Sequence, residues 1–202
     1  MREMEKEFRE SIDREEMEQL PLYTYQGGVV VIENPEDADK EIEKLRKHSI
    51  LGFDTETRPA FHKGESHNVG LLQLATTEHV CLFRLNRCGF GLNLRRLLES
   101  PGILKIGVGI RDDLRCLRRT GDFTPAGFVD MQEYAARFGI ADKSFSKLMA
   151  IIFNVRISKR QRVSNWEAPK LTEAQIRYAA TDAWGALKMY QRLSSGEYRF
   201  PL

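Results

Sequence analysis

Cysteine and histidine are scarce in this chain of 202 residues. The three cysteines (Cys81, Cys88 and Cys116) form no CxxC pair, and the four histidines show no HExxH or HxxxH spacing. An odd number of dispersed cysteines argues against a disulfide framework and against a zinc-thiolate site, and the histidine spacing argues against a zinc enzyme. The cysteine pattern fits the reducing cytoplasm.

Long apolar runs are also missing. No run reaches the roughly 18 residues that a membrane span needs, and the first ten residues, MREMEKEFRE, lack the apolar centre of a signal peptide. We therefore expect a soluble, cytoplasmic protein that does not act at a membrane. A length of 202 residues, 42% of them apolar, suits one domain with a sizeable core and a small appendage.

The net charge of +2 says little about partners, but the charges are unevenly distributed. Residues 1–60 carry 9 Lys or Arg and 16 Asp or Glu, whereas the remainder carries 22 and 13. An acidic front on a basic body permits a polyanionic substrate without requiring one.

Alternating strand and helix patterns predict an α/β fold with a mixed sheet flanked by helices. Residues 2–20 read as a charged helix, interpreted as an appendage on the domain surface. Asn34 and Pro35 are typical of a helix start, and Thr172 with Gln175 forms a capping box before a last helix that reaches about Leu193. Strands are expected at 29–32, 50–53, 68–75, 79–84 and 103–107, and further helices at 92–99, 111–119, 131–138 and 144–153.

The first motif with chemical meaning is Asp54-Thr-Glu56, which follows an apolar strand. Period-two alternation points both carboxylates to one face, where they repel each other unless one is protonated or a cation lies between them. Magnesium and manganese prefer such oxygen ligands. Two alternatives are that the acids simply end a strand in solvent, or that Asp54 is the nucleophile of a haloacid dehalogenase phosphatase. The phosphatase motif, however, has Asp two residues after its nucleophile, where this chain has Glu56.

The second motif lies on the last predicted helix. Spacing of i,i+4 places Tyr178 and Asp182 on one face, and small neighbours such as Ala179 and Ala183 would let this helix approach the sheet closely. A third carboxylate could then join the first two. A partly buried Tyr–Asp hydrogen bond without further function is the alternative.

The third motif is the run of residues 105–114, in which a strand enters a glycine-containing turn before a helix. Gly107 and Gly109 resemble a dinucleotide-binding fingerprint, but its third glycine position holds Asp112, which would oppose a pyrophosphate. Asp112 is better explained as a first-turn acid that interacts with the helix dipole. Asp113 can then face the sheet edge.

Taken in their order along the chain, Asp54-Thr-Glu56, then Asp113 after the glycine-containing turn, then Tyr178 with Asp182, these motifs resemble the DEDDy 3′-5′ exonucleases. The resemblance is greatest to the group formed by the exonuclease domain of the Werner syndrome helicase and its bacterial relatives, and weaker to ribonuclease D. It runs from about residue 29 to 193 and includes the stretches 70–75, 106–110, 164–166 and 171–183. The histidine branch of the superfamily has its base five residues before the last Asp, where this chain has Arg177, so the tyrosine branch is indicated.

The resemblance implies a ribonuclease-H-like (DnaQ-like exonuclease) fold over residues 28–195, after an N-terminal helix and connector (1–27) and before a tail (196–202). It also implies two divalent cations, Mg²⁺ or Mn²⁺, and release of 5′-mononucleotides. Asp54 would bridge both ions, Glu56 and Asp182 would complete the first site, and Asp113 would hold the second. Tyr178 would orient the attacking water.

Contacts with the substrate are less defined by the sequence. The candidates for nucleic-acid binding are Thr55, His67, Lys159, Arg160, Arg162 and Trp166. For the basic stretch and Trp166, a solvated loop with the indole packed in the core is an equal alternative to phosphate binding with base stacking. The expected partner is a nucleic acid with a free 3′ end, single-stranded or recessed. RNA or DNA preference and oligomeric state stay open, as does the alternative of a catalytically silent nucleic-acid-binding protein.

Overall fold

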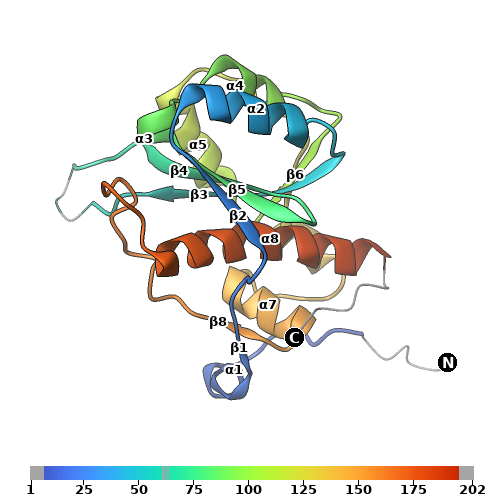
Figure 1. The fold of residues 1–202 in the computed structure, drawn as a ribbon. Coiled ribbons are helices and arrows are strands. Elements are labelled where there is room, and N and C mark those ends of the chain that lie inside the picture. The colour runs from blue at the N-terminus through green and yellow to red at the C-terminus, as the bar shows by residue number, and fades with distance from the viewer. Residues whose placement is uncertain (1–6, 61, 63, 196–202) are drawn as a thin grey trace.

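The computed structural model describes residues 7–60, 62 and 64–195, and Figure 1 shows their arrangement. Its helices are α1 (Arg14–Gln19), α2 (Pro35–Leu45), α3 (Leu85–Cys88), α4 (Leu92–Leu98), α5 (Arg111–Thr120), α6 (Met131–Ala136), α7 (Phe145–Phe153) and α8 (Glu173–Ser195). Its strands are β1 (Leu22–Tyr23), β2 (Gly28–Ile32), β3 (Ile50–Thr57), β4 (Val69–Ala75), β5 (His79–Arg84), β6 (Leu104–Gly107), β7 (Phe128–Asp130) and β8 (Arg156–Ile157). Among these helices, none combines the length and the apolar character that crossing a membrane requires.

The central sheet has six strands in the order β2-β5-β4-β3-β6-β7. Strand β4 runs antiparallel to both β3 and β5, whereas the β2–β5, β3–β6 and β6–β7 pairs are parallel. The prediction of a mixed sheet is therefore confirmed. Strand β6 pairs only with residues 50–52 of β3, so the second half of β3 extends beyond its parallel neighbour.

Helices cover both faces of the sheet (Figure 1). Helices α2 and α4 lie on one face, where Ile42 and Leu97 pack with strand residues such as Phe83. The long helix α8 crosses the other face, and α7 packs against it from outside. The predicted helix starts are confirmed: Asn34 accepts from the Asp37 N–H at 2.9 Å, and Thr172 and Gln175 cap each other reciprocally.

The N-terminal segment differs from its prediction. Residues 1–6 lie outside the described part, and of residues 7–20 only Arg14–Gln19 are helical, starting at the Asp13 cap. Phe8 and Ile12 are buried in the cluster formed by α7 and α8, whereas most other residues of the segment are exposed, so two apolar side chains anchor it on the surface. The prediction of a helix was wrong for residues 7–13, where the burial of these two side chains favours an extended path over the core.

The connector that follows is fixed to helix α8. The Tyr25 N–H donates to the Thr181 hydroxyl at 3.0 Å, and the Arg177 guanidinium donates to the Gly27 carbonyl at 2.8 Å. Strand β1 also pairs in parallel with β8, which opens the basic stretch of residues 156–162. The sequence predicts a loop or hairpin for this stretch. The proposed domain limits at residues 28 and 195 remain predictions.

Candidate metal and nucleic-acid site

Strand β3 and helix α8 approach each other unusually closely at Gly52. A Cβ atom added to Gly52 would lie 2.0 Å from the carbonyl oxygen of Ala183, well inside van der Waals contact. Ala179 and Ala183 are fully buried on the facing side of the helix. The predicted role of small residues is therefore confirmed: they let α8 lie directly on the strand that carries Asp54.

Three carboxylates meet where α8 crosses β3. Asp54 and Glu56 project from the same face of the strand and Asp182 from the helix, and one oxygen of each lies within 4.8 Å of the others. The strand continues through Glu56 to Thr57, so both acids are held by pairing with β4 rather than by a loop. The idea that they merely end a strand in solvent is excluded by this convergence.

Asp113 supplies the fourth carboxylate from the first turn of α5. It accepts a hydrogen bond from the Thr55 hydroxyl, which places it beside β3, while Asp112 is exposed and pairs with Arg115 at 3.0 Å. The structure thus separates the two adjacent acids as the sequence suggested: one faces the carboxylate cluster and the other faces solvent. Thr55, a candidate for nucleic-acid binding, is engaged with Asp113.

The turn before α5 is shaped by Gly109 and Asp130. Gly109 has φ of 70°, a conformation that favours glycine, and its N–H donates to Asp130 at 2.9 Å. Asp130 also accepts from the Ile110 N–H and caps α6. Asp130 was not among the predicted site residues. Its position directly before a predicted helix could have indicated that it caps that helix.

Burial raises the pKa values of all four acids, and repulsion within the cluster raises those of Asp54 and Glu56 further. Desolvation is the largest cause for each, and for Asp54 the charges of Asp182, Asp113 and Glu56 add to it, so that its pKa lies well above the ordinary range. The pKa of Glu56 is raised to about 9, that of Asp182 to about 7 and that of Asp113 to about 6. Without a cation, the cluster therefore holds protons near neutral pH.

We expect the metal-free protein to lose stability as the pH rises from about 5 to about 8. The folded-state pKa values of Asp113, Asp182 and Glu56 lie above the unfolded values of about 4, so the folded state binds more protons. This contribution is complete below the unfolded pKa and is lost as the pH rises through about 6, 7 and 9. Thermal unfolding in EDTA should show a falling Tm, and Mn²⁺ should reduce the fall.

The predicted fall in stability is limited to pH values below about 8 because Lys105 has the opposite effect above that pH. Desolvation lowers the pKa of the buried Lys105 to about 8, so its deprotonation adds stability at higher pH. Glu56→Gln should flatten the Tm profile between about pH 5 and 8. An equally steep profile in that variant would contradict the assignment of the slope to the cluster.

The cluster contains an oxygen that protein groups leave unsatisfied. Asp182 Oδ1 is buried and has no hydrogen-bond partner in the described part of the chain, while a hydrogen bond from Tyr178 lowers the pKa of Asp182 against the effect of burial. A buried carboxylate oxygen without a donor is costly unless a cation meets it. The residues present therefore fit a divalent ion bound by oxygen ligands.

The predicted nucleic-acid contacts fall into three groups. Lys159, Arg160 and Arg162 are exposed on the loop after β8, and the charge of Arg162 lowers the pKa of Glu56. His67 pairs with Glu65 at 2.8 Å. Trp166 is completely buried, with its ring 6.0 Å from that of Tyr178, so the stacking interpretation was wrong and the core interpretation is correct. Phe61 and Lys63, which follow the first motif in the sequence and were further candidates for lining a cleft, lie outside the described residues.

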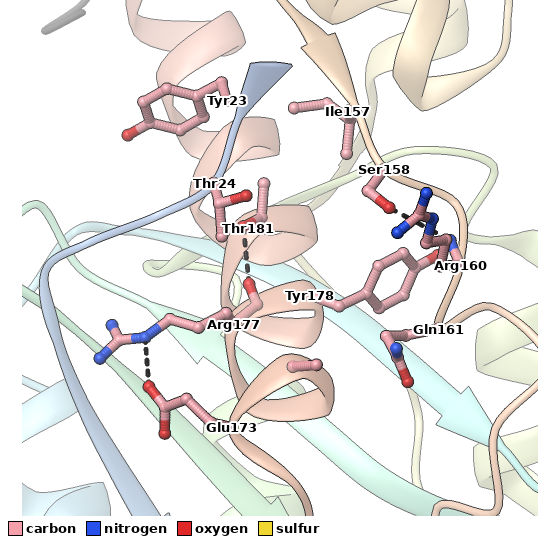
Figure 2. A pocket seen from close by; sticks show the side chains of 11 residues that line it. Tyr23, Thr24, Ile157, Ser158, Arg160, Gln161, Glu173, Arg177, Tyr178 and Thr181 are labelled. Atoms are coloured by element: carbon pink, nitrogen blue, oxygen red, sulfur yellow. Dashed lines mark hydrogen bonds and ion pairs between the residues drawn. The ribbon is translucent and has the colours of Figure 1, made fainter.

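A cavity of about 460 Å³ lies beside Tyr178 and Thr181 of α8 (Figure 2). Strand β1, the loop after β8 and the first turns of α8 enclose it, and the Tyr178 ring extends from the helix toward Gln161 and Arg160. Tyr23 and Thr24 line the opposite wall. This cavity is of a size that commonly holds small ligands.

Comparison with known proteins decides the family. The family model described as 3′-5′ exonuclease matches residues 29–196, most of the chain. The chain belongs to the 3′-5′ exonuclease family. Exonucleases of this family depend on divalent metal ions, in agreement with the carboxylate cluster.

Individual relatives support the same family. The chain is 32% identical to the bifunctional 3′-5′ exonuclease/ATP-dependent helicase WRN of Mus musculus over 87% of this chain and 13% of that protein. It is 32% identical to ribonuclease D of Gluconacetobacter diazotrophicus over 81% of this chain and 42% of that protein. The crystal structure of Escherichia coli RNase D, an exoribonuclease involved in structured RNA processing, has a TM-score of 0.75 and 25% identity, covering 82% of this chain and 44% of that one.

These comparisons confirm the expected fold and family. The exonuclease domains among the structural neighbours have the ribonuclease-H-like fold, a mixed sheet flanked by helices. The chain spans less than half the length of each of these three relatives.

One polar residue beside the cluster was missed as a site residue. Gln73 stands opposite Asp54 in the register of β3 and β4, is fully buried, and neither atom of its amide has a hydrogen-bond partner among the described residues. It lay within the family-like stretch 70–75, and an amide in the middle of an otherwise apolar strand was the available signal.

Proposed function

We propose that this protein is a 3′-5′ exonuclease of the tyrosine-containing DEDDy type, which hydrolyses nucleic acid from a 3′ end to 5′-mononucleotides. The observation that carries the proposal is the convergence of Asp54, Glu56, Asp113 and Asp182 from two helices and one strand, at pKa values that make an ion-free cluster protonated. The family match supports the same reaction.

Two divalent cations, Mg²⁺ or Mn²⁺, would be held by the four carboxylates. Asp54 would contribute to both sites, with Glu56 and Asp182 at the first and Asp113 at the second. Bound there, the ions would supply positive charge to the attacking and leaving oxygens of a phosphodiester. Thr55 fixes the carboxylate of Asp113 through its hydroxyl, and so holds one ligand in place before any ion binds.

Tyr178 would position the attacking water rather than deprotonate it. Burial raises the pKa of its phenol, and the charges of Asp182, Glu56 and Asp54 raise it further, so the hydroxyl keeps its proton at neutral pH. Its ring is held against the buried Trp166. A fixed, protonated hydroxyl beside the cluster is suited to hydrogen-bonding a water molecule in a defined orientation.

The substrate would approach over the loop that carries Lys159, Arg160 and Arg162. These cations are exposed, the charge of Arg162 lowers the pKa of Glu56, and cations of this kind bind phosphates without regard to sequence. The cavity beside Tyr178, with Arg160 in its lining, offers space for a nucleoside-sized group.

We expect Arg162→Ala to raise KM for an oligonucleotide by roughly three- to tenfold and to make binding less sensitive to salt, because one phosphate contact is lost. Loss of the Arg162 charge should raise the pKa of Glu56 only slightly, because that charge is the smallest cause acting on it. We therefore expect kcat to change less than KM. Steady-state kinetics at two salt concentrations measure both effects. Arg14→Ala, on the exposed helix α1, is the matched control. Equal effects of the two changes would contradict a substrate contact at Arg162.

The function itself is tested with matched RNA and DNA oligonucleotides labelled at the 5′ end, single-stranded or with recessed 3′ ends. A ladder of products shortened from the 3′ end, formed with Mg²⁺ or Mn²⁺ and abolished by EDTA, is the expected result. Binding without shortening, under all these conditions, would favour the catalytically silent alternative. The comparison of the four substrates also identifies the preferred nucleic acid.

A further inference from the structure

A second group of metal-binding side chains lies on the opposite face of the sheet from α8. Glu41 comes from α2, and His79 and Cys81 come from β5, where period-two spacing points both toward that helix. One atom of each lies within 4.8 Å of the others. Cys81 is fully buried, so the group is part of the packed layer between α2 and the sheet.

The distances within this group are close to those of a zinc site. Glu41 Oε2 is 3.9 Å from Cys81 Sγ and 4.0 Å from His79 Nε2. In a tetrahedral zinc site with bonds of about 2.0–2.3 Å, donor atoms are roughly 3.3–3.7 Å apart. Side-chain shifts of a few tenths of an ångström bring these two pairs to such distances, and the third pair, thiol to imidazole, lies within 4.8 Å.

Thr76 contacts the other ring nitrogen of His79. Its hydroxyl oxygen lies 3.1 Å from the His79 carbonyl and 3.3 Å from His79 Nδ1, and it accepts from the N–H groups of Glu78 and His79. The imidazole is thereby held by Nδ1, and Nε2 faces Glu41. A ligating imidazole whose other nitrogen donates to an oxygen is the usual arrangement in protein metal sites.

The two oxygens of Glu41 have different partners. Oε1 is bound by Lys44 at 2.6 Å, whereas Oε2 faces the thiol and the imidazole. Lys44 is largely exposed and leaves the inner oxygen accessible. A groove of about 530 Å³, lined by Glu41, Lys44 and Val30 among others, reaches Glu41 from solvent.

We propose that Glu41, His79 and Cys81 bind a zinc ion that ties α2 to strand β5. Thiolate and imidazole ligands favour zinc over magnesium or manganese, which distinguishes this site from the carboxylate cluster. On binding, the S–H bond of Cys81 breaks, a Zn–S bond forms and the proton passes to solvent. Desolvation, and next the charge of Glu41, raises the pKa of the free thiol to about 12, so the site is protonated until an ion displaces that proton.

Cobalt(II) in place of zinc provides a test with a spectroscopic signature. Titration of EDTA-treated, reduced protein with Co²⁺ should give a thiolate-to-cobalt charge-transfer band that saturates at one ion per chain and disappears on addition of Zn²⁺. Ions in the carboxylate cluster give no such band, because that cluster contains no sulfur. The result is therefore independent of the proposed exonuclease function.

Variants identify the ligands. The band should be lost in Cys81→Ser and retained in Cys88→Ser, which replaces another buried cysteine, and in Cys116→Ser. Where Cys81→Ser fails to fold, Glu41→Gln serves instead and should weaken cobalt binding at least tenfold. The absence of the band in the wild type, its survival in Cys81→Ser, or unchanged affinity in Glu41→Gln would each overturn the proposal.

Discussion

Replacing Asp54 by Asn should reduce hydrolysis by about a thousandfold or more, because loss of the central carboxylate removes a ligand from both proposed ions and with it several kcal/mol of charge stabilisation. The same change should raise the Tm of the metal-free protein. Without an ion, Asp54 must either carry a charge beside Asp182, Asp113 and Glu56 in a desolvated site or hold a proton above its ordinary pKa, and an uncharged amide of the same shape avoids both costs. Single-turnover hydrolysis with excess Mn²⁺ and thermal unfolding in EDTA measure the two effects.

Asp112→Asn is the matched control for this experiment. Asp112 is an exposed acid in the same helical turn as Asp113, but it pairs with Arg115 outside the cluster. We expect its replacement to leave hydrolysis within about twofold and the Tm nearly unchanged, as is usual for surface positions. Near-normal turnover by Asp54→Asn would show that the metal site is elsewhere. Opposite signs of the activity and stability effects distinguish loss of chemistry from loss of the fold.

Gly52→Ala should both destabilise the protein and lower its activity. The added methyl group would lie 2.0 Å from the Ala183 carbonyl, so α8 must move away from β3. Overpacking of this kind costs about 1–3 kcal/mol or more. The shift also separates Asp182 from Asp54, and misplacement by about 1 Å can lower a rate on the order of a hundredfold. Denaturant unfolding and single-turnover kinetics check the two parts.

Gly102→Ala is the corresponding control. A Cβ at Gly102 would meet only the Ser100 hydroxyl oxygen, at 3.9 Å, which is an ordinary contact. This change should leave activity unaltered and stability within about 1 kcal/mol. If Gly52→Ala behaved like Gly102→Ala, the close approach of strand and helix would not be what sets the distance between Asp54 and Asp182.

The parts of the fold that the sequence predicted well are those in which local pattern and tertiary structure agree. Asn34 and Thr172 begin helices through bonds to backbone groups three residues away, and alternation along residues 50–56 places Asp54 and Glu56 on one face. Such interactions depend on neighbours in the chain and can be read without knowledge of the rest.

The parts that could not be predicted depend on distant contacts. Strands β1 and β8 are two residues each and exist because they pair with one another, from positions 134 residues apart. The sequence did not decide whether Trp166 is buried or exposed, because the burial of an indole depends on distant residues that pack over it. The grouping of Glu41 with His79 and Cys81 is hidden for the same reason, since only the packing of α2 on β5 brings the first to the others.

The connector ahead of β2 has a consequence for the catalytic helix. Its bonds reach Arg177 and Thr181, each of which directly precedes a residue of the proposed active site, Tyr178 and Asp182. The family match begins only at residue 29. Tyr25 and Gly27, which bind helix α8, therefore precede the residues that match the family. The position of this helix depends in part on residues outside the matched region.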